Sequence, residues 1–159
     1  MRITVLTVGR LKEKYWTDAV AEYAKRLGRY AKLIITEVED EKTPDGASEK
    51  EEAAILQKEG ERLLAKLPED AWVIALAIEG KQPDSVELSR KIEKLALEGH
   101  SHLAFVIGGS LGLSPAVLKR ADELLSFSRM TFPHQLMRVI LLEQIYRSFR
   151  IARNEPYHK

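Results

Sequence analysis

Apolar residues are distributed along this chain in two kinds of segment, one typical of buried strands and the other of amphipathic helices. Short runs of β-branched and other apolar residues predict strands over 3–8, 33–38, 72–78, 102–107 and 124–128. Apolar residues at three- and four-residue spacing predict helices over 14–27, 48–66, 85–98 and 133–153, with a short helix starting at 114. Strands that alternate with helices predict an α/β fold, a single open, mostly parallel sheet with helices on both faces.

Local signals mark the ends of some of these helices. Ser48, with Glu51 three residues later, has the spacing of a capping box. Gly28 directly follows a helical pattern and predicts a left-handed cap. Because no internal repeat or long linker divides the chain, we expect a single domain over residues 1–159.

Composition narrows the class of protein. Hydrophobic residues make up 45% and charged residues 31% of the chain, which is ordinary for a globular protein with a sizeable core. No stretch approaches the ~20 apolar residues of a membrane span, and the N-terminus has no leader pattern. The absence of cysteine excludes a disulfide framework, a thiolate nucleophile and a cysteine zinc site. We therefore expect a cytoplasmic protein that does not enter a membrane.

The net charge is only +1, but the charges are unevenly distributed. Residues 1–36 hold eight Lys/Arg against three Asp/Glu, and residues 129–159 hold six against two. Residues 37–70 hold five against twelve. If the two basic ends meet in the fold, they form a phosphate-binding surface. The alternative is that these segments are ordinary solvated faces.

Three loops are candidate ligand-binding segments, because ligands of open α/β sheets bind beyond the carboxyl ends of the strands. These loops follow the third, fourth and fifth predicted strands and cover residues 76–81, 108–112 and 127–134. Glycine in the second loop allows close approach of the backbone to a ligand. The spacing matches neither the dinucleotide fingerprint nor the P-loop, so NAD and ATP lack their usual signatures. A tight strand-to-helix turn is the alternative interpretation of Gly108 and Gly109.

The last predicted helix and the tail carry further candidate chemistry. The helix has too many apolar residues for one narrow stripe, so it is either deeply buried or shared with another subunit. Arg147, Arg150 and Arg153 repeat at three-residue spacing and so line one face of the helix. This face is either a surface for an RNA backbone or an ordinary solvated helix end. Such a short polar tail is ordinarily frayed. Tyr157 and His158 nevertheless offer base stacking, hydrogen bonding and proton transfer.

Several segments, taken in order, resemble the RlmH family. They are ITVLTVGRLKEKYW from Ile3, FVIGGSLGL from Phe105, LSFSRMTFPHQLMRV from Leu125, EQIYR from Glu143 and PYHK from Pro156. The resemblance covers essentially the whole chain, and the ordered combination is specific. Members of this family are bacterial SPOUT-class enzymes that methylate N3 of a pseudouridine in large-subunit (23S) ribosomal RNA.

The resemblance implies a fold, a cofactor and partners. The C-terminal segment would be threaded into a deep trefoil knot, an exception to the rule that chains are unknotted. The methyl donor S-adenosylmethionine would lie in that knot, no metal would be needed, and the protein would be a homodimer that acts on the ribosome. The implied donor contacts are Leu76, Gly108, Phe127, Ser128, Arg129, Met130, Thr131 and Phe132.

The resemblance also suggests catalytic roles. Methyl transfer to N3 needs an aligned nucleophile that has lost its proton. Arg147 would stabilise negative charge on the ring carbonyls. His158 would act as the base or orient it, and Tyr157 would stack or donate a hydrogen bond. His134 would position the knot loop or the RNA, or serve only as a structural helix cap.

Two alternative functions stand beside this one. A SPOUT enzyme acting on tRNA or another rRNA site is disfavoured by the full-length resemblance and the Pro-Tyr-His tail. A non-enzymatic ribosome-binding factor is disfavoured by the intact glycine and knot loops. Binding of S-adenosylmethionine, measured by calorimetry, distinguishes the enzyme from the binding factor.

Overall fold

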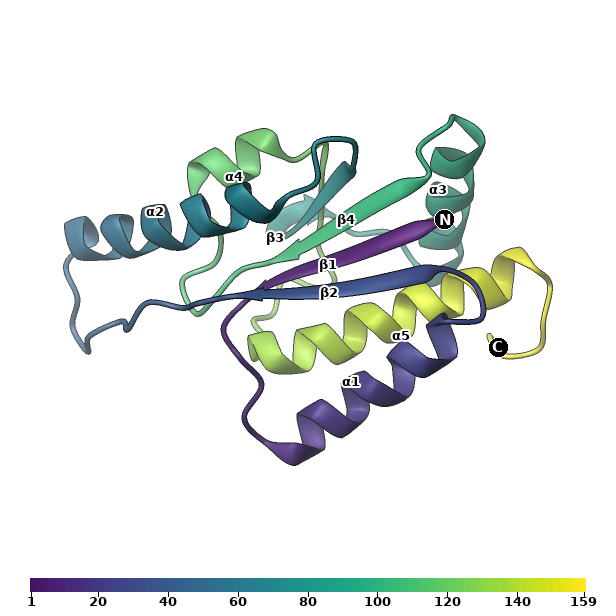
Figure 1. The fold of residues 1–159 in the computed structure, drawn as a ribbon, viewed down its shortest axis with the longest axis horizontal. Helices are drawn as coiled ribbons and strands as arrows, with labels where there is room; N and C mark the ends of the chain where they lie inside the picture. Colours follow the sequence, from purple (N-terminus) through teal and green to yellow (C-terminus); the bar gives the residue numbers. More distant parts are fainter.

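Five strands and five helices alternate along the chain in the structure, a computed structural model that describes residues 1–159 (Figure 1). The strands are β1 (Arg2–Val8), β2 (Lys32–Val38), β3 (Trp72–Lys81), β4 (His102–Ile107) and β5 (Glu123–Leu125). The helices are α1 (Lys14–Leu27), α2 (Glu49–Lys66), α3 (Ser85–Leu97), α4 (Pro115–Arg120) and α5 (His134–Ala152). Every predicted element is present, and the predicted alternation is confirmed.

The strands form one sheet in the order β2-β1-β4-β3-β5, and every neighbouring pair is parallel. The prediction of a single parallel α/β sheet is therefore confirmed. The central strands β1 and β4 pair with Val5 opposite Phe105, and both residues are almost fully buried. All the carboxyl ends consequently lie along one edge of the sheet, where the loops after β3, β4 and β5 emerge.

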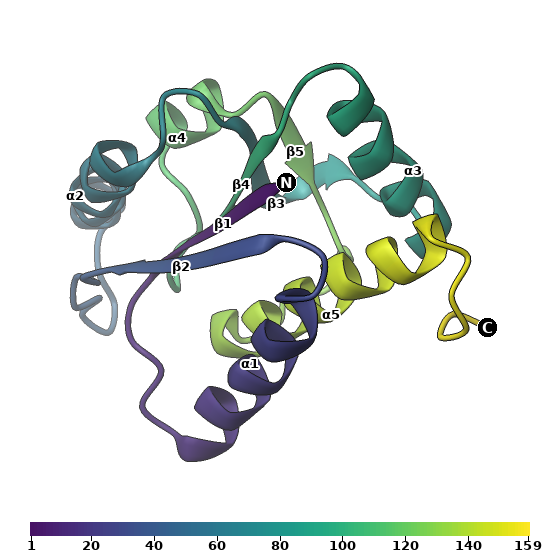
Figure 2. The same cartoon turned by 45° about the vertical axis from the view of Figure 1, so that its right-hand side comes forward.

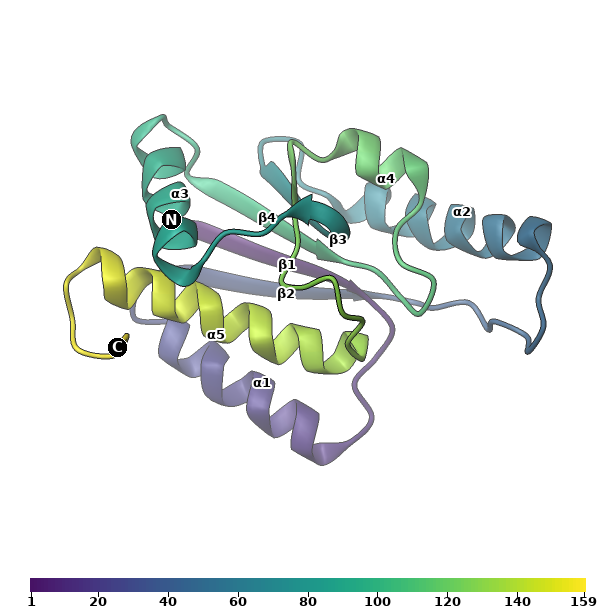
Figure 3. The ribbon, with the colours of Figure 1, turned by 180° about the vertical axis from the view of Figure 1, so that it is seen from behind.

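Helices cover both faces of the sheet, with α1, α3 and α5 on one side and α2 and α4 on the other (Figures 2 and 3). Alternate residues of the central strands point to opposite layers. The layer of α5 receives Ile3, Val5, Leu103, Phe105 and Ile107. The layer of α2 and α4 receives Leu6, Val8, Ala104 and Val106. None of the helices combines the length and apolar content needed to cross a membrane.

Three local predictions differ from the structure. The third strand runs to Lys81 and not to 78, so residues 76–81, predicted as a ligand loop, belong to β3. The fifth strand ends at Leu125 and not at 128: the Ser126 N–H still donates to the Lys81 carbonyl (2.8 Å), and beyond it the chain leaves the sheet. Gly28 has a φ of −57°, so it continues the right-handed turn and is not a left-handed cap. The predicted capping box is confirmed, since the Ser48 hydroxyl accepts from the Glu51 N–H while the Glu51 carboxylate accepts from the Ser48 N–H.

Arg138 fixes the start of α5 at the carboxyl end of β1. Its buried guanidinium donates to the carbonyls of Val8 (3.0 Å) and Gly9 (2.7 Å) and to the Glu37 carboxylate (2.6 Å). Hydrogen bonds from a charged donor are about twice as strong as neutral ones. This anchor places the first turn of α5 beside the loops that leave the sheet.

Candidate active site

The end of β3 and the segments after β4 and β5 enclose a cavity of about 140 Å³ at the carboxyl edge of the sheet, which we call the cleft. Nine of its sixteen lining residues are hydrophobic, and none is Asp or Glu. The wall consists of the end of β3 (76–78), the segment 107–112, the segment 125–132, and His134 and Met137 from α5. The sixteen residues thus combine apolar side chains with glycine backbone and hydroxyl groups.

The structure brings seven of the eight implied donor contacts together in this cleft. They are Leu76, Gly108, Phe127, Ser128, Met130, Thr131 and Phe132. Arg129 is exposed and is not part of the lining. The segment around it is held by its own hydroxyls: Ser126 Oγ donates to the Ser128 carbonyl (3.0 Å), and Ser128 Oγ accepts from the Met130 N–H (2.9 Å).

Gly108 and Gly112 form a tight turn whose geometry explains why glycine is present. A Cβ on Gly108 would lie 2.3 Å from the Gly112 carbonyl oxygen, and Gly112 has a φ of +87°, where other residues are strained. The close approach at Gly108 is therefore made by the loop itself. The tight-turn interpretation left open above accounts for this glycine, whose backbone still lines the cleft.

His134 lies at the first turn of α5, where its side chain is half-buried in the cleft wall. Its Nδ1 atom is buried and has no hydrogen-bond partner. Burial lowers the pKa of His134, and the Arg138 charge lowers it further, against the opposing effect of Asp40. The imidazole is consequently neutral at pH 7 and has a nitrogen free to bond a ligand or the backbone.

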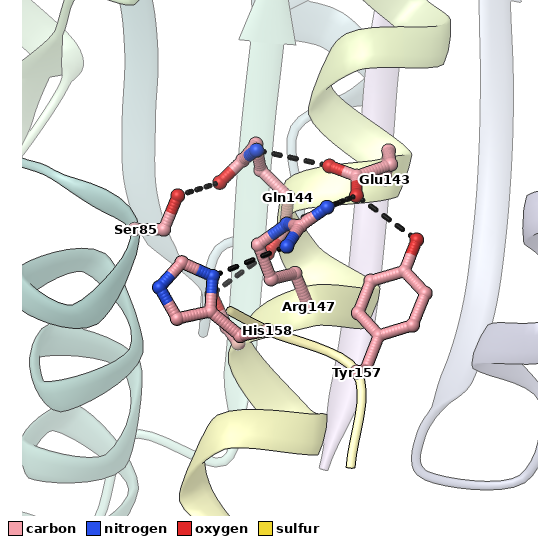
Figure 4. Close-up of polar contacts among 7 residues, drawn as sticks. Ser85, Glu143, Gln144, Arg147, Tyr157 and His158 are labelled. Carbon is pink, nitrogen blue, oxygen red and sulfur yellow. Dashed lines mark hydrogen bonds and ion pairs between the residues drawn. The ribbon is translucent and has the colours of Figure 1, made fainter.

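A second group of functional side chains, the tail cluster, lies along the C-terminal half of α5 and consists of Glu143, Arg147, Tyr157 and His158 (Figure 4). Glu143 Oε1 accepts from Arg147 Nε (3.0 Å) and from the Tyr157 hydroxyl (3.0 Å). Arg147 Nη1 lies 3.1 Å from His158 Nδ1. The structure therefore brings three of the four predicted catalytic residues together.

Protonation states in the tail cluster follow from these contacts. Burial, together with the hydrogen bond to Glu143, raises the pKa of Tyr157 to about 12, so the phenol keeps its proton at pH 7. The bond to Glu143 also raises the pKa of Arg147. Because arginine only donates, Nδ1 of His158 must accept, which puts the proton of the neutral imidazole on the exposed Nε2. In this arrangement His158 is a donor with its lone pair already engaged.

The tail is docked and not frayed, contrary to the general expectation for a short polar terminus. Arg150 donates to the Glu155 carboxylate (2.8 Å) and to the Pro156 carbonyl (2.8 Å), and the Tyr30 hydroxyl also donates to Glu155 (2.8 Å). The Tyr157 ring packs edge-on against Tyr146, with ring centroids 4.9 Å apart. Arg150 is thereby committed to the tail, whereas Arg147 uses three of its five N–H donors on Glu143 and His158.

Three residues that support the tail cluster were missed by the sequence prediction. Glu143 is its central acceptor, and the spacing of Glu143 and Arg147, four apart on a helix, was a usable signal. Gln144 donates to Glu143 (2.9 Å) and accepts from the Ser85 hydroxyl (2.8 Å) (Figure 4). Nothing in the local sequence of α3 indicates the role of Ser85.

The cleft and the tail cluster are separated within one chain. His134 and Arg147 are thirteen positions apart on the same straight helix, which corresponds to about 20 Å at 1.5 Å per residue. His134 accordingly belongs to the cleft and does not contact the other three predicted catalytic residues.

Comparison with known proteins identifies the class. Residues 1–158 match the family model described as "Predicted SPOUT methyltransferase", so the chain is a member of the SPOUT methyltransferases. Two relatives, both named ribosomal RNA large subunit methyltransferase H, come from Bifidobacterium adolescentis (65% identical) and Bacillus pumilus (62% identical). Each alignment covers all of both proteins. The chain belongs to the family of ribosomal RNA large subunit methyltransferase H, which confirms the resemblance drawn from the sequence.

Solved structures share the fold at low sequence identity. A probable methyltransferase from Bordetella pertussis has a TM-score of 0.56 at 14% identity, over 92% of this chain and 95% of that one. A putative methyltransferase from Legionella pneumophila, solved with bound S-adenosylmethionine, has a TM-score of 0.50 at 13% identity, over 96% and 66%. At these identities the likeness concerns the fold alone.

Proposed function

We propose that this chain, as a single domain over residues 1–159, methylates N3 of a pseudouridine in 23S ribosomal RNA with S-adenosylmethionine as the donor. The family relatives are named for the large-subunit ribosomal RNA on which they act. The observation that carries the proposal is the cleft, where loops from three adjacent strands present apolar walls and backbone groups at the edge where α/β sheets bind ligands.

The lining of the cleft fits this donor. Leu76, Phe127 and Phe132 provide apolar surface for an adenine ring and a thioether, and the backbone at Gly108 provides polar groups. Ser128 and Thr131 add hydroxyls. When bound, the donor supplies a methyl group on a positively charged sulfur. The Legionella pneumophila methyltransferase, which shares this fold, was solved with S-adenosylmethionine bound.

We propose that the segment between β5 and α5 forms the family's trefoil knot around the cleft. Strand β5, which ends directly before this segment, packs tightly against the end of β3, and this supports the proposal. Leu125 pairs with both Leu76 and Lys81, and a Cβ on Gly80 would lie 2.7 Å from the backbone of Leu124 and Leu125. The segment therefore starts at the edge of the sheet where the cleft lies, and six of its residues line the cleft.

A homodimer would unite the cleft with the tail cluster. The apolar residues Leu136, Val139 and Ile140 are only partly buried, and they continue at helical spacing into Glu143 and Arg147. This stripe thus runs from the cleft to the tail cluster. A two-fold axis through its middle would pack it on the same stripe of a second copy and bring each tail cluster to the partner's cleft.

The tail cluster suits stabilisation of a deprotonated uracil-type ring. Loss of the N3 proton puts negative charge on the ring carbonyls. The Arg147 guanidinium and the Nε2–H of His158 are donors for such an anion, and Glu143 with Tyr157 fixes their geometry. Since Nδ1 of His158 accepts from Arg147, we assign His158 to charge stabilisation and leave the proton to solvent.

The test is transfer of radiolabelled methyl groups to ribosomes that lack the modification, with calorimetric binding of S-adenosylmethionine measured in parallel. We expect S-adenosylmethionine to bind and N3 to be methylated. Free 23S RNA, the large subunit and the whole ribosome are compared as separate substrates. Arg147→Ala should lower the transfer rate about 10²-fold or more and spare donor binding. Arg90→Ala, which removes an exposed arginine on α3, serves as the control. Methylation of tRNA alone, or donor binding without transfer, would refute the proposal.

A further inference from the structure

Glu59 is a buried carboxyl that the mechanism above does not use. It lies on α2 and is only 4% exposed. Its Oε2 atom accepts from the Glu41 N–H (3.0 Å), whereas Oε1 is buried without a partner. Burial raises the pKa of Glu59, so the fold keeps a carboxyl where it is unfavourable. A buried polar group maintained at such a cost needs a physical explanation.

Glu59 and its neighbour Gly60 lie beside both ends of the turn that lines the cleft. A Cβ on Gly109 would lie 3.2 Å and 3.4 Å from the two oxygens of Glu59, so the carboxyl occupies the space next to the Gly109 backbone that a side chain at 109 would need. At the other end of the turn, a Cβ on Gly60 would lie 2.3 Å from Ser114 Oγ. One turn of α2 therefore lies against both the beginning and the end of residues 109–114.

The same carboxyl also connects this turn to the segment after β2. Glu59 accepts from the Glu41 N–H, and the Glu41 carboxylate in turn accepts from Arg62 (3.2 Å) on the next turn of α2. Thr43 Oγ1 in turn lies 3.5 Å from Ser110 Oγ on the glycine turn. Movement of Glu59 would thus affect both the segment after β2, which contains Glu41 and Thr43, and the turn that contains Ser110.

From this arrangement we propose that Glu59 is a positioning residue for methyl-donor binding and that it acts through Gly109. Glu59 is not among the residues that line the cleft, so its effect reaches the donor only through the Gly109 backbone, which does line it. The inference rests on the proposed function for the identity of the donor. The contact with Gly109 itself is independent of that identity.

The test compares substitutions at Glu59 with matched changes on the same helix. Glu59→Ala removes the support of Gly109, and Glu59→Asp draws the carboxyl back by one methylene while retaining its charge. We expect both to raise the Kd for S-adenosylmethionine by about tenfold, the equivalent of about one lost hydrogen bond, because the Gly109 backbone that lines the cleft would no longer be held in place. Glu59→Gln retains the volume and an oxygen for Glu41 and should restore the Kd to within about threefold of the parent.

Two controls separate positioning from a general loss of stability. Leu63→Ala, one turn further along α2 in the same core layer, should lower the Tm without raising the donor Kd. Glu61→Gln removes an exposed carboxylate from the same helix and should change neither. A parental Kd in Glu59→Asp, or an equal rise in Leu63→Ala, would overturn the inference.

Amide hydrogen exchange of residues 108–112 without donor provides a second measurement. Glu59→Asp should accelerate exchange in this turn, whereas Leu63→Ala should leave it at the parental rate relative to the surrounding sheet. A parent that binds no S-adenosylmethionine would refute the proposed function, and the exchange measurement would still decide whether Glu59 holds the turn. Unchanged exchange in Glu59→Asp would refute the positioning role.

Discussion

Deleting residues 157–159 separates the chemistry of the tail cluster from that of the cleft. The deletion removes the phenol that donates to Glu143 and the imidazole that bonds Arg147. It leaves the lining of the cleft unchanged, because none of residues 157–159 is among the sixteen residues that line it. Donor binding should therefore survive while methyl transfer fails.

The structure gives the expected loss of stability. The phenol–carboxylate hydrogen bond contributes about 1.5–3 kcal/mol, the edge-on contact with Tyr146 about 0.5–1.5, and the contact of Arg147 with the Tyr157 ring (4.6 Å) about 0.5–1. These contributions overlap, and the ordered tail loses conformational entropy in the folded state. A net cost of about 1–3 kcal/mol corresponds to a Tm lower by about 2–12 °C for a chain of this length.

The assay is single-turnover methyl transfer to ribosomes at 25 °C, with donor Kd and Tm measured on the same preparations. We expect the rate to fall by ~10²–10⁴, the loss typical of one positioned catalytic group, with the donor Kd unchanged. Tyr157→Phe retains the ring and removes only the donor to Glu143, and His158→Ala removes only the imidazole. Transfer at the parental rate by the truncated chain would show that the tail takes no part in the chemistry.

Two further predictions concern the interface and His134. Ile140→Glu puts a charge in the middle of the partly buried α5 stripe, so sedimentation should show a folded monomer. This monomer should bind the donor but should not transfer methyl groups. An active monomer would exclude the shared site. Because the pKa of His134 is lowered in the fold, the unfolded chain takes up this proton first as the pH falls. The free energy of unfolding should therefore fall below pH ~6.5, and His134→Gln should flatten that fall. An identical pH profile in His134→Gln would contradict the assigned burial.

The arrangement of elements could be predicted from the sequence because the signals are local. The apolar run of β4 and the capping box at Ser48 depend on residues adjacent in the chain, and both appear as expected. The end of β5 could not be predicted, since it depends on pairing with β3, where Leu125 lies opposite Lys81, 44 positions earlier. The conformation of Gly28 could not be predicted either, because glycine permits a left-handed cap but does not require one.

The site was predicted in part for the same reason. The three loops could be grouped because parallel strands end at one edge, and the structure gathers seven of the eight implied contacts there. The spacing of Glu143 and Arg147 was a local signal, but the role of Glu143 as acceptor for Tyr157 was missed because that contact forms only after the tail folds back along α5. Glu59 was missed because its contact with Gly109 joins the two segments only in three dimensions.

The position of α5 explains why one copy of this chain is an incomplete site for the proposed reaction. Leu141, Leu142 and Ile145 are fully buried in the middle of the helix, between α1 and α3. A helix held along its centre cannot bend sharply without a proline or a bulge, and α5 contains neither. The cleft at one end and the tail cluster at the other consequently stay apart, whereas methyl transfer needs donor and nucleophile in contact. In the proposed dimer, a second copy packed across the stripe that joins the two groups would supply that contact without any change in the fold of either chain.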